Sequence, residues 1–212
     1  HDQSSAASDV YKRQAFFHNT ANIIAIGCHA GKCAMSPGIY IGRRAGERSF
    51  SGSNVFIGVN AGMEQEVYGN NVMLGNNAGC CSICGQFNTF VGHGAAMGNR
   101  LGSFNVAIGR CAGPSHNTSE GALTKSPTGG LNFYAGFKTG ICIVEGEGNV
   151  LLGNHSGIGY TTGSHNISIG STVGPQTCGA SGCDNISIGR STGINITSCL
   201  LYTSPSPRDV RS

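Results

Sequence analysis

Apolar and polar residues alternate in short stretches that return along the chain at a nearly constant spacing. The stretch Asn71–Gly79, NVMLGNNAG, returns in closely similar form at Asn54–Gly62, Asn105–Gly113 and Asn149–Gly157. Each copy has a central glycine, called the anchor glycine below. The ten anchors are Gly27, Gly42, Gly58, Gly75, Gly92, Gly109, Gly136, Gly153, Gly170 and Gly189. Six of the nine intervals are 16 or 17 residues, which is the signature of a repeat architecture.

The positions one and three before the anchor glycine are aliphatic in nearly every copy. Such alternation is typical of a β-strand with one buried face, and we expect these aliphatic columns to face the core. Small residues three and four after the anchor predict a tight corner. The pattern predicts an all-β protein, a β-solenoid (parallel β-helix or β-roll) of about ten coils with a period of about 17 residues, each coil made of strand, corner, weaker strand and corner. A triangular and a flattened cross-section both fit.

Asparagine occupies the position four before the anchor in eight of the ten copies. This residue tolerates the left-handed conformation and bonds to its own backbone. Stacked coil upon coil, it can also form a hydrogen-bonded ladder.

The column two before the anchor is mostly large and apolar in the middle of the chain and becomes serine at Ser168 and Ser187. If the aliphatic columns face inward, alternation turns this column outward. We therefore expect a self-association or partner face, and the serines predict that the contact ends near the eighth coil. Its residues are Tyr40, Phe56, Met73, Phe90, Tyr134 and Leu151.

Composition narrows the function classes. The segment between Ala15 and Ser198 contains nine Lys and Arg residues and seven Asp and Glu residues. This small excess gives no basis for nucleic-acid binding, which needs clustered positive charge. No apolar run approaches the ~18 residues of a membrane span. The glycines, 35 of 212 residues, do not recur at every third position, which excludes collagen.

Cysteines and glycosylation motifs indicate an oxidising, extracellular setting. Cys28 with Cys33, and Cys178 with Cys183, lie five apart around small-residue turns and are candidate local disulfides. Cys111 and Cys142 are candidates to join neighbouring coils. Cys80 or Cys81 with Cys84 approximates zinc spacing, but no second pair completes a site, so we predict no metal.

Two of the five N-x-S/T motifs are candidate glycosylation sites. Asn117, inside the insertion, is the better candidate, and Asn154 comes next. Asn166 and Asn185 occupy the repeat asparagine column, and a laddered asparagine is a poor glycan acceptor.

No catalytic constellation stands out. The carboxylates share no column, and His93 and His155 fall one and two residues after their anchors, as expected of corner residues. Phosphate-loop and dinucleotide motifs are missing because no helix follows the glycines. We therefore expect no enzyme activity and no cofactor.

The phrases NVAIGRCAG, NISIGSTVG and NISIGRST resemble the head repeats of trimeric autotransporter adhesins, in which three chains pack side by side in a left-handed roll. NVFIGVNAG and NVMLGNNAG also resemble the Asn-Gly repeats of phage and bacterial tail fibres. The resemblance covers Asn22–Gly193, but the adhesin period is shorter than 17 and that family lacks these cysteines and the insertion.

The ends of the chain differ from the repeats. SAASDVYKRQ and LLYTSPSPRD resemble conceptual translations of sequencing-adapter DNA. We therefore expect adapter-like tails at 1–14 and 199–212, and a solenoid domain at 15–198 that carries an insertion at 114–131.

Taken together, these features predict an extracellular structural or adhesive protein of a cell or virion surface. It would be a segment of a fibre or oligomeric stalk, self-assembling or homo-oligomeric, with a glycan or surface ligand, no nucleic acid and no membrane span in this fragment. The alternatives are a left-handed β-helix acyltransferase, which needs a catalytic histidine between coils, and a secreted carbohydrate-binding module, which needs single aromatics exposed along a groove.

Overall fold

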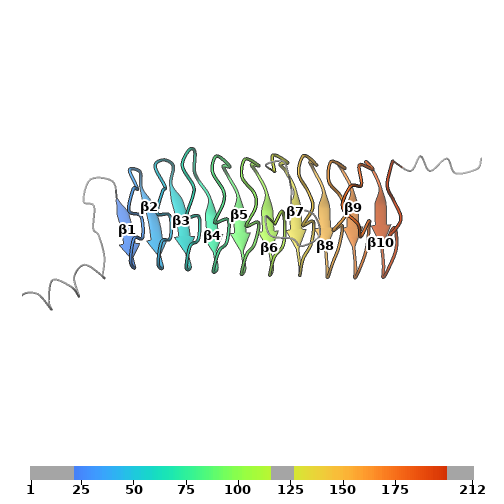
Figure 1. Cartoon of the computed structure of the whole chain (residues 1–212), viewed down its shortest axis with the longest axis horizontal. Coiled ribbons are helices and arrows are strands. Elements are labelled where there is room, and N and C mark those ends of the chain that lie inside the picture. The colour runs from blue at the N-terminus through green and yellow to red at the C-terminus, as the bar shows by residue number, and fades with distance from the viewer. Residues whose placement is uncertain (1–21, 116–126, 200–212) are drawn as a thin grey trace, which may run out of the picture.

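The computed structural model describes residues 22–115 and 127–199, and it confirms the predicted β-solenoid (Figure 1). One short strand opens each coil, and ten parallel strands form a single sheet in sequence order. The strands are β1 (Ile23–Ile26), β2 (Gly38–Ile41), β3 (Asn54–Ile57), β4 (Val72–Leu74), β5 (Thr89–Val91), β6 (Val106–Ile108), β7 (Phe133–Ala135), β8 (Val150–Leu152), β9 (Ile167–Ile169) and β10 (Ile186–Ile188).

The repeat columns deduced from sequence are the pairing register of the sheet. In β3 and β4, for example, Val55 pairs with Val72 and Phe56 with Met73. The weaker second strand is not found in the described residues, where only an isolated bridge joins Tyr160 to Ala180. The return half of each coil instead consists of turns, which still bond to the next coil, as in Gly62 N–H to the Ala78 carbonyl at 3.0 Å.

Each anchor glycine is required by its backbone conformation, and all except Gly189 also by the close approach of the next coil. Gly75 has a φ of +134°, and a β-carbon there would lie 2.5 Å from the carbonyl oxygen of Gly92 in the next coil. A side chain is therefore excluded both by the conformation and by the close approach of successive coils. This explains why the anchor is glycine in all ten copies.

The repeat asparagines form the expected ladder inside the rod. The backbone N–H of Asn88 donates to Asn71 Oδ1 at 2.9 Å, and that of Asn105 donates to Asn88 Oδ1 at 2.9 Å. Each side-chain amide also donates to a glycine carbonyl, as Asn88 does to Gly102 at 3.0 Å. The same pattern continues to Asn185, and each buried amide thus supports the coil that follows it.

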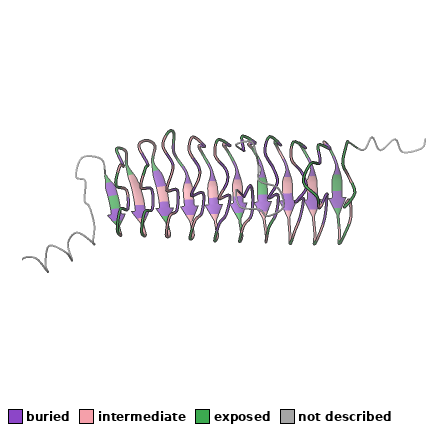
Figure 2. Cartoon of the chain, in the orientation of Figure 1, coloured by how far each residue is buried: buried purple, intermediate pink, exposed green. Residues whose placement is uncertain are grey.

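The predicted orientation of the strands is wrong. The column two before the anchor points into the rod, and the aliphatic columns one and three before it point out, as the burial pattern of β4 (partly exposed, buried, partly exposed) shows. Figure 2 shows the purple, buried positions within the strands. The interior takes the large side chains because the rod has room for one bulky residue per coil, opposite a small-residue corner.

The insertion leaves the stacking intact at both of its described ends. Gly98 N–H donates to the Pro114 carbonyl and Leu101 N–H to the Pro127 carbonyl, each at 3.0 Å. Residues 116–126 of the insertion, the predicted tail 1–14 and residues 200–212 of the second predicted tail lie outside the described residues.

Candidate interaction surfaces

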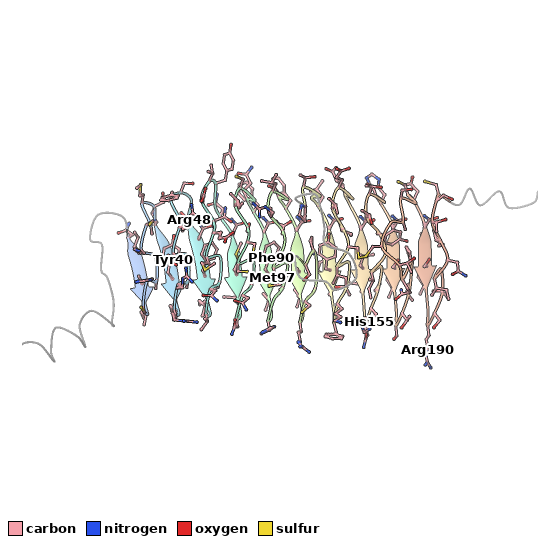
Figure 3. The ribbon with its side chains drawn as sticks, in the orientation of Figure 1. Tyr40, Arg48, Phe90, Met97, His155 and Arg190 are labelled. Atoms are coloured by element: carbon pink, nitrogen blue, oxygen red, sulfur yellow. A yellow bond between two sulfur atoms is a disulfide. The ribbon has the colours of Figure 1, made fainter. Side chains whose placement is uncertain are left out.

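The six residues expected to form a partner face are core residues. Tyr40, Phe56, Met73, Phe90, Tyr134 and Leu151 are all fully buried. The Tyr40 and Phe56 rings meet edge to face with centroids 5.8 Å apart. Figure 3 shows Tyr40 and Phe90 within the rod. A β-carbon on Gly62 would lie 2.6 Å from the Phe56 ring, so the glycine corner makes room for it.

The surface that sequence reasoning assigned to the core is the exposed one. We call the residues one and three before each anchor glycine the outer sheet face. None of its twenty residues is buried, and all but Thr89 are apolar. Its most exposed members are Ile24, Ile26, Ile57, Ile108, Phe133, Ile186 and Ile188. Ten strands at ~4.8 Å spacing give this face a length of ~43 Å.

An aromatic corner widens the outer sheet face in its middle coils. Phe87, Phe104 and Leu131 lie five before their anchors, on the same side by alternation, and are 48%, 51% and 65% exposed. The Phe87 and Phe104 rings stack with centroids 5.1 Å apart. All three have φ near +57°, which is uncommon for bulky residues and costs strain.

One signal in the sequence could have set the orientation correctly. The asparagine column lies four before the anchor glycine, and the column of Phe56 and Phe90 lies two before it. The two columns therefore face the same side of the strand. An asparagine ladder belongs inside, because its amides need partners on every coil. The aliphatic columns must then face out.

A second surface carries most of the positive charge. We call the two residues after each anchor glycine the strand-end edge, because they form the corner where the strands end. This edge contains five cations and three histidines and no Asp or Glu: Arg43, Arg44, Arg110, Lys138, Arg190, His29, His93 and His155. In Figure 3, His155 and Arg190 lie along this lower edge, whereas Arg48 lies towards the opposite one.

The cysteines do not follow the predicted pairing. Cys142, in the coil that begins with β7, forms a disulfide with Cys178, in the coil that begins with β9. The predicted Cys178–Cys183 pair is therefore wrong, and Cys28 and Cys33 are both free. Cys142 links two coils that are separated by the coil of β8, not neighbouring coils as predicted, and Cys111 is free.

Cys80 and Cys81 form a close pair of thiols with Sγ atoms 3.4 Å apart. The hydrogen bond with Cys81, together with burial, raises the pKa of the Cys80 thiol, whereas the hydrogen bond from Cys80 lowers the pKa of Cys81. No cluster of three metal-ligating side chains occurs among the residues that the structure describes.

The asparagines of the glycosylation motifs differ in their exposure. Asn154 is exposed at the strand-end edge, and Asn117 lies outside the described residues. Asn166 and Asn185 are buried in the ladder, as predicted, so their side chains are inaccessible to a glycan transferase.

The described surface offers two shallow hollows. The larger, about 480 Å³, is lined by residues 193–198 at the last described coil. The smaller, about 300 Å³, lies between Lys32, Arg44, Glu47 and Glu64. His93 and His155 lie outside both hollows, at the strand-end edge, in keeping with corner positions.

Comparisons of the chain with protein-family models, with curated proteins and with solved structures find no match. Within residues 22–115 and 127–199, no helix has the length and apolar character needed to cross a bilayer.

Proposed function

We propose that this chain is a structural or adhesive protein of an extracellular or cell or virion surface, a rod-shaped segment of a fibre that associates side by side with a second copy and performs no catalysis. The observation that carries the proposal is the outer sheet face. It is a strip of apolar side chains along the whole described rod, interrupted only by Thr89, with no charged residue in either column.

The extent of this face fits a protein contact. A strip ~43 Å long and two side-chain columns wide presents several hundred Å², which matches or exceeds the largest apolar patch of a typical monomer. Burying ~500 Å² of it stabilises a complex by roughly 12 kcal/mol before the association cost of ~4–15 kcal/mol. The gain is thus comparable with the cost of association, and the aromatic corner at Phe87 and Phe104 adds further apolar area.

A second copy is the occupant that matches the face best. The partner has to present apolar side chains at the same ~4.8 Å spacing over the same length. The outer sheet face itself has this spacing and length, and a two-fold contact places the same patch on both partners.

The surface location is supported by the Cys142–Cys178 disulfide, because such bonds persist in oxidising compartments.

Sedimentation of paired variants tests the association. Ile57→Ser with Ile108→Ser removes two exposed isoleucines from the outer sheet face, and Met35→Ser with Val67→Ser removes exposed apolar residues elsewhere. The native chain and the control pair should sediment well above the 21.7 kDa monomer, and the face variant near that mass, with unchanged thermal unfolding. A native chain that stays at 21.7 kDa at every concentration would refute lateral association.

A further inference from the structure

The charges of the rod are segregated. Of the eight described Lys and Arg residues, five lie on the strand-end edge, whereas all six described acids lie elsewhere in the coil. Those acids are Glu47, Glu64, Glu66, Glu145, Glu147 and Asp184. One long edge is therefore cationic although the rod as a whole is nearly neutral.

Most cations of this edge have no acidic partner among the residues that the structure describes. Arg44 is bonded to Glu47, its Nε lying 2.5 Å from the carboxylate. Among the described residues, no ion pair joins Arg43, Arg110, Lys138 or Arg190 to an acid.

Two of these cations are held against one ring. Arg110 and Lys138 lie over Phe137, 5.5 and 5.6 Å from its centroid, and His155 meets the same ring edge-on at 5.2 Å. The ring attracts each cation, so both positive charges are held within about 6 Å of one ring centroid. The cluster covers three successive coils and is a natural contact point for an anionic group.

The backbone fixes the spacing of the edge. Lys138 N–H donates to the Arg110 carbonyl at 3.1 Å, and His155 N–H donates to the Phe137 carbonyl at 2.9 Å. Each corner is thus bonded to the preceding one, so that the cations are held on a rigid line. From Arg43 to Arg190 this line covers eight coil steps, or ~38 Å.

From this arrangement we infer that the strand-end edge binds a linear acidic polysaccharide, one that carries sulfate or carboxylate groups. A rigid line of cations fits a linear polyanion. Five cations over ~38 Å are sparse compared with duplex DNA, which has one charge per ~1.7 Å, and so favour a polymer with wider charge spacing. The inference names the ligand of the adhesive rod, but it uses a different surface from the outer sheet face and survives if lateral association fails.

The test uses the full chain and polymers that share one backbone: dextran sulfate, carboxymethyl dextran and unmodified dextran. The edge variant is Arg110→Ser with Lys138→Asn, because asparagine tolerates the left-handed backbone of Lys138, whose φ is +53°. The control is Arg48→Ser with Arg100→Ser, the same charge change on the return half. Arg190→Ser is a second edge variant in another coil.

Binding is measured by interferometry at low and high salt, after circular dichroism has confirmed the fold of each variant. We expect dextran sulfate or carboxymethyl dextran to bind and dextran not to bind, with affinity falling as salt rises. The double edge variant should bind about 3- to 10-fold more weakly, since exposed ion pairs contribute modestly. Arg190→Ser should bind about 2-fold more weakly, and the control should match the native chain.

Which of the two charged polymers binds more tightly identifies sulfate or carboxylate as the preferred group. The inference is overturned if unmodified dextran binds as well as the charged polymers, if the control variant is weakened as much as the edge variants, or if duplex DNA binds more tightly than either charged dextran.

Discussion

Tyr40 and Tyr134 occupy the same column in the two halves of the rod, and their hydroxyl groups have opposite surroundings. Both side chains are fully buried. The Tyr40 hydroxyl lies 3.1 Å from Ser49 Oγ, whereas that of Tyr134 has no hydrogen-bond partner among the described residues. Both tyrosines lie two before the anchor, so the column alone does not determine how well a core residue is accommodated.

The difference arises on the return half of the coil, seven residues after the anchor. From the second to the fifth coil this position is polar and bonded: Ser49 contacts Tyr40, and Ser82 donates to Gln65 Oε1 at 3.0 Å. In the seventh and eighth coils it is Ile143 and Tyr160, both buried. An apolar corner packs well but leaves the Tyr134 hydroxyl unpaired.

Unpaired buried groups therefore gather in the C-terminal half, where the hydroxyls of Thr139 and Thr192 also have no partner. Each such group costs roughly 1–3 kcal/mol. The same half has the disulfide, which offsets part of that cost. In a solenoid each coil contacts only its neighbours, so the two halves can differ in local stability.

The largest expected effect comes from the disulfide. Cys142→Ser with Cys178→Ser opens a link between residues 36 apart and should lower the stability of the C-terminal half by about 2–4 kcal/mol. Hydrogen exchange should show faster opening of β7–β10, with β2–β5 little changed. Cys28→Ser with Cys33→Ser is the control, and equal loss in both variants would contradict the assigned pair.

The two tyrosines give a matched pair of smaller effects. Tyr40→Phe removes a bonded hydroxyl and leaves Ser49 with one partner fewer, which should cost about 1 kcal/mol in the free energy of unfolding. Tyr134→Phe removes an unpaired hydroxyl and should be neutral or stabilising by up to ~1 kcal/mol. Urea unfolding measures both, and equal losses would show that the halves do not differ as described.

The smallest expected effect is on the free energy of unfolding at alkaline pH. Burial raises the pKa of Tyr134; burial also raises the pKa of Tyr40, but its hydrogen bonds with Ser49 and Asn54 oppose the shift. Above pH ~10 the unfolded chain releases tyrosine protons that the folded chain keeps, so stability is full below that pH and falls as pH rises.

Tyr134→Phe should remove one such contribution, worth about 1 kcal/mol at pH ~11. Its stability should decline less steeply with pH than that of Tyr40→Phe. If the free energy of unfolding falls equally steeply with pH in both variants, the two hydroxyl groups do not differ in their surroundings as described.

Much of the fold could be predicted because each coil needs the same residue types at the same positions. The anchor spacing identified every strand, and the asparagine column identified the ladder, since both depend on residues a few positions apart. The orientation of the strands relative to the core was not predicted correctly, because isoleucine and valine usually indicate buried positions. Exposed aliphatic side chains also occur on surfaces that contact other proteins.

The remaining features depend on contacts that no short pattern reveals. Cys142 and Cys178 lie 36 residues apart and meet across an intervening coil. The strand-end edge was missed because its Lys and Arg residues occur in only four of the ten coils, either one or two residues after the anchor, so that neither column is cationic throughout. In the net charge of the chain, the positive charge of this edge is nearly cancelled by the acids elsewhere in the coils. Composition alone therefore gave no indication of a cationic surface.

The orientation of the strands underlies both the outer sheet face and the core, and two neighbouring residues of β5 test it most directly. Phe90 is fully buried and Val91 partly exposed. Phe90→Ala should lower the free energy of unfolding of the dilute chain by about 3–5 kcal/mol, and Val91→Ala by about 1 kcal/mol or less. A larger loss for Val91→Ala than for Phe90→Ala would contradict the orientation of the strands and, with it, the outer sheet face.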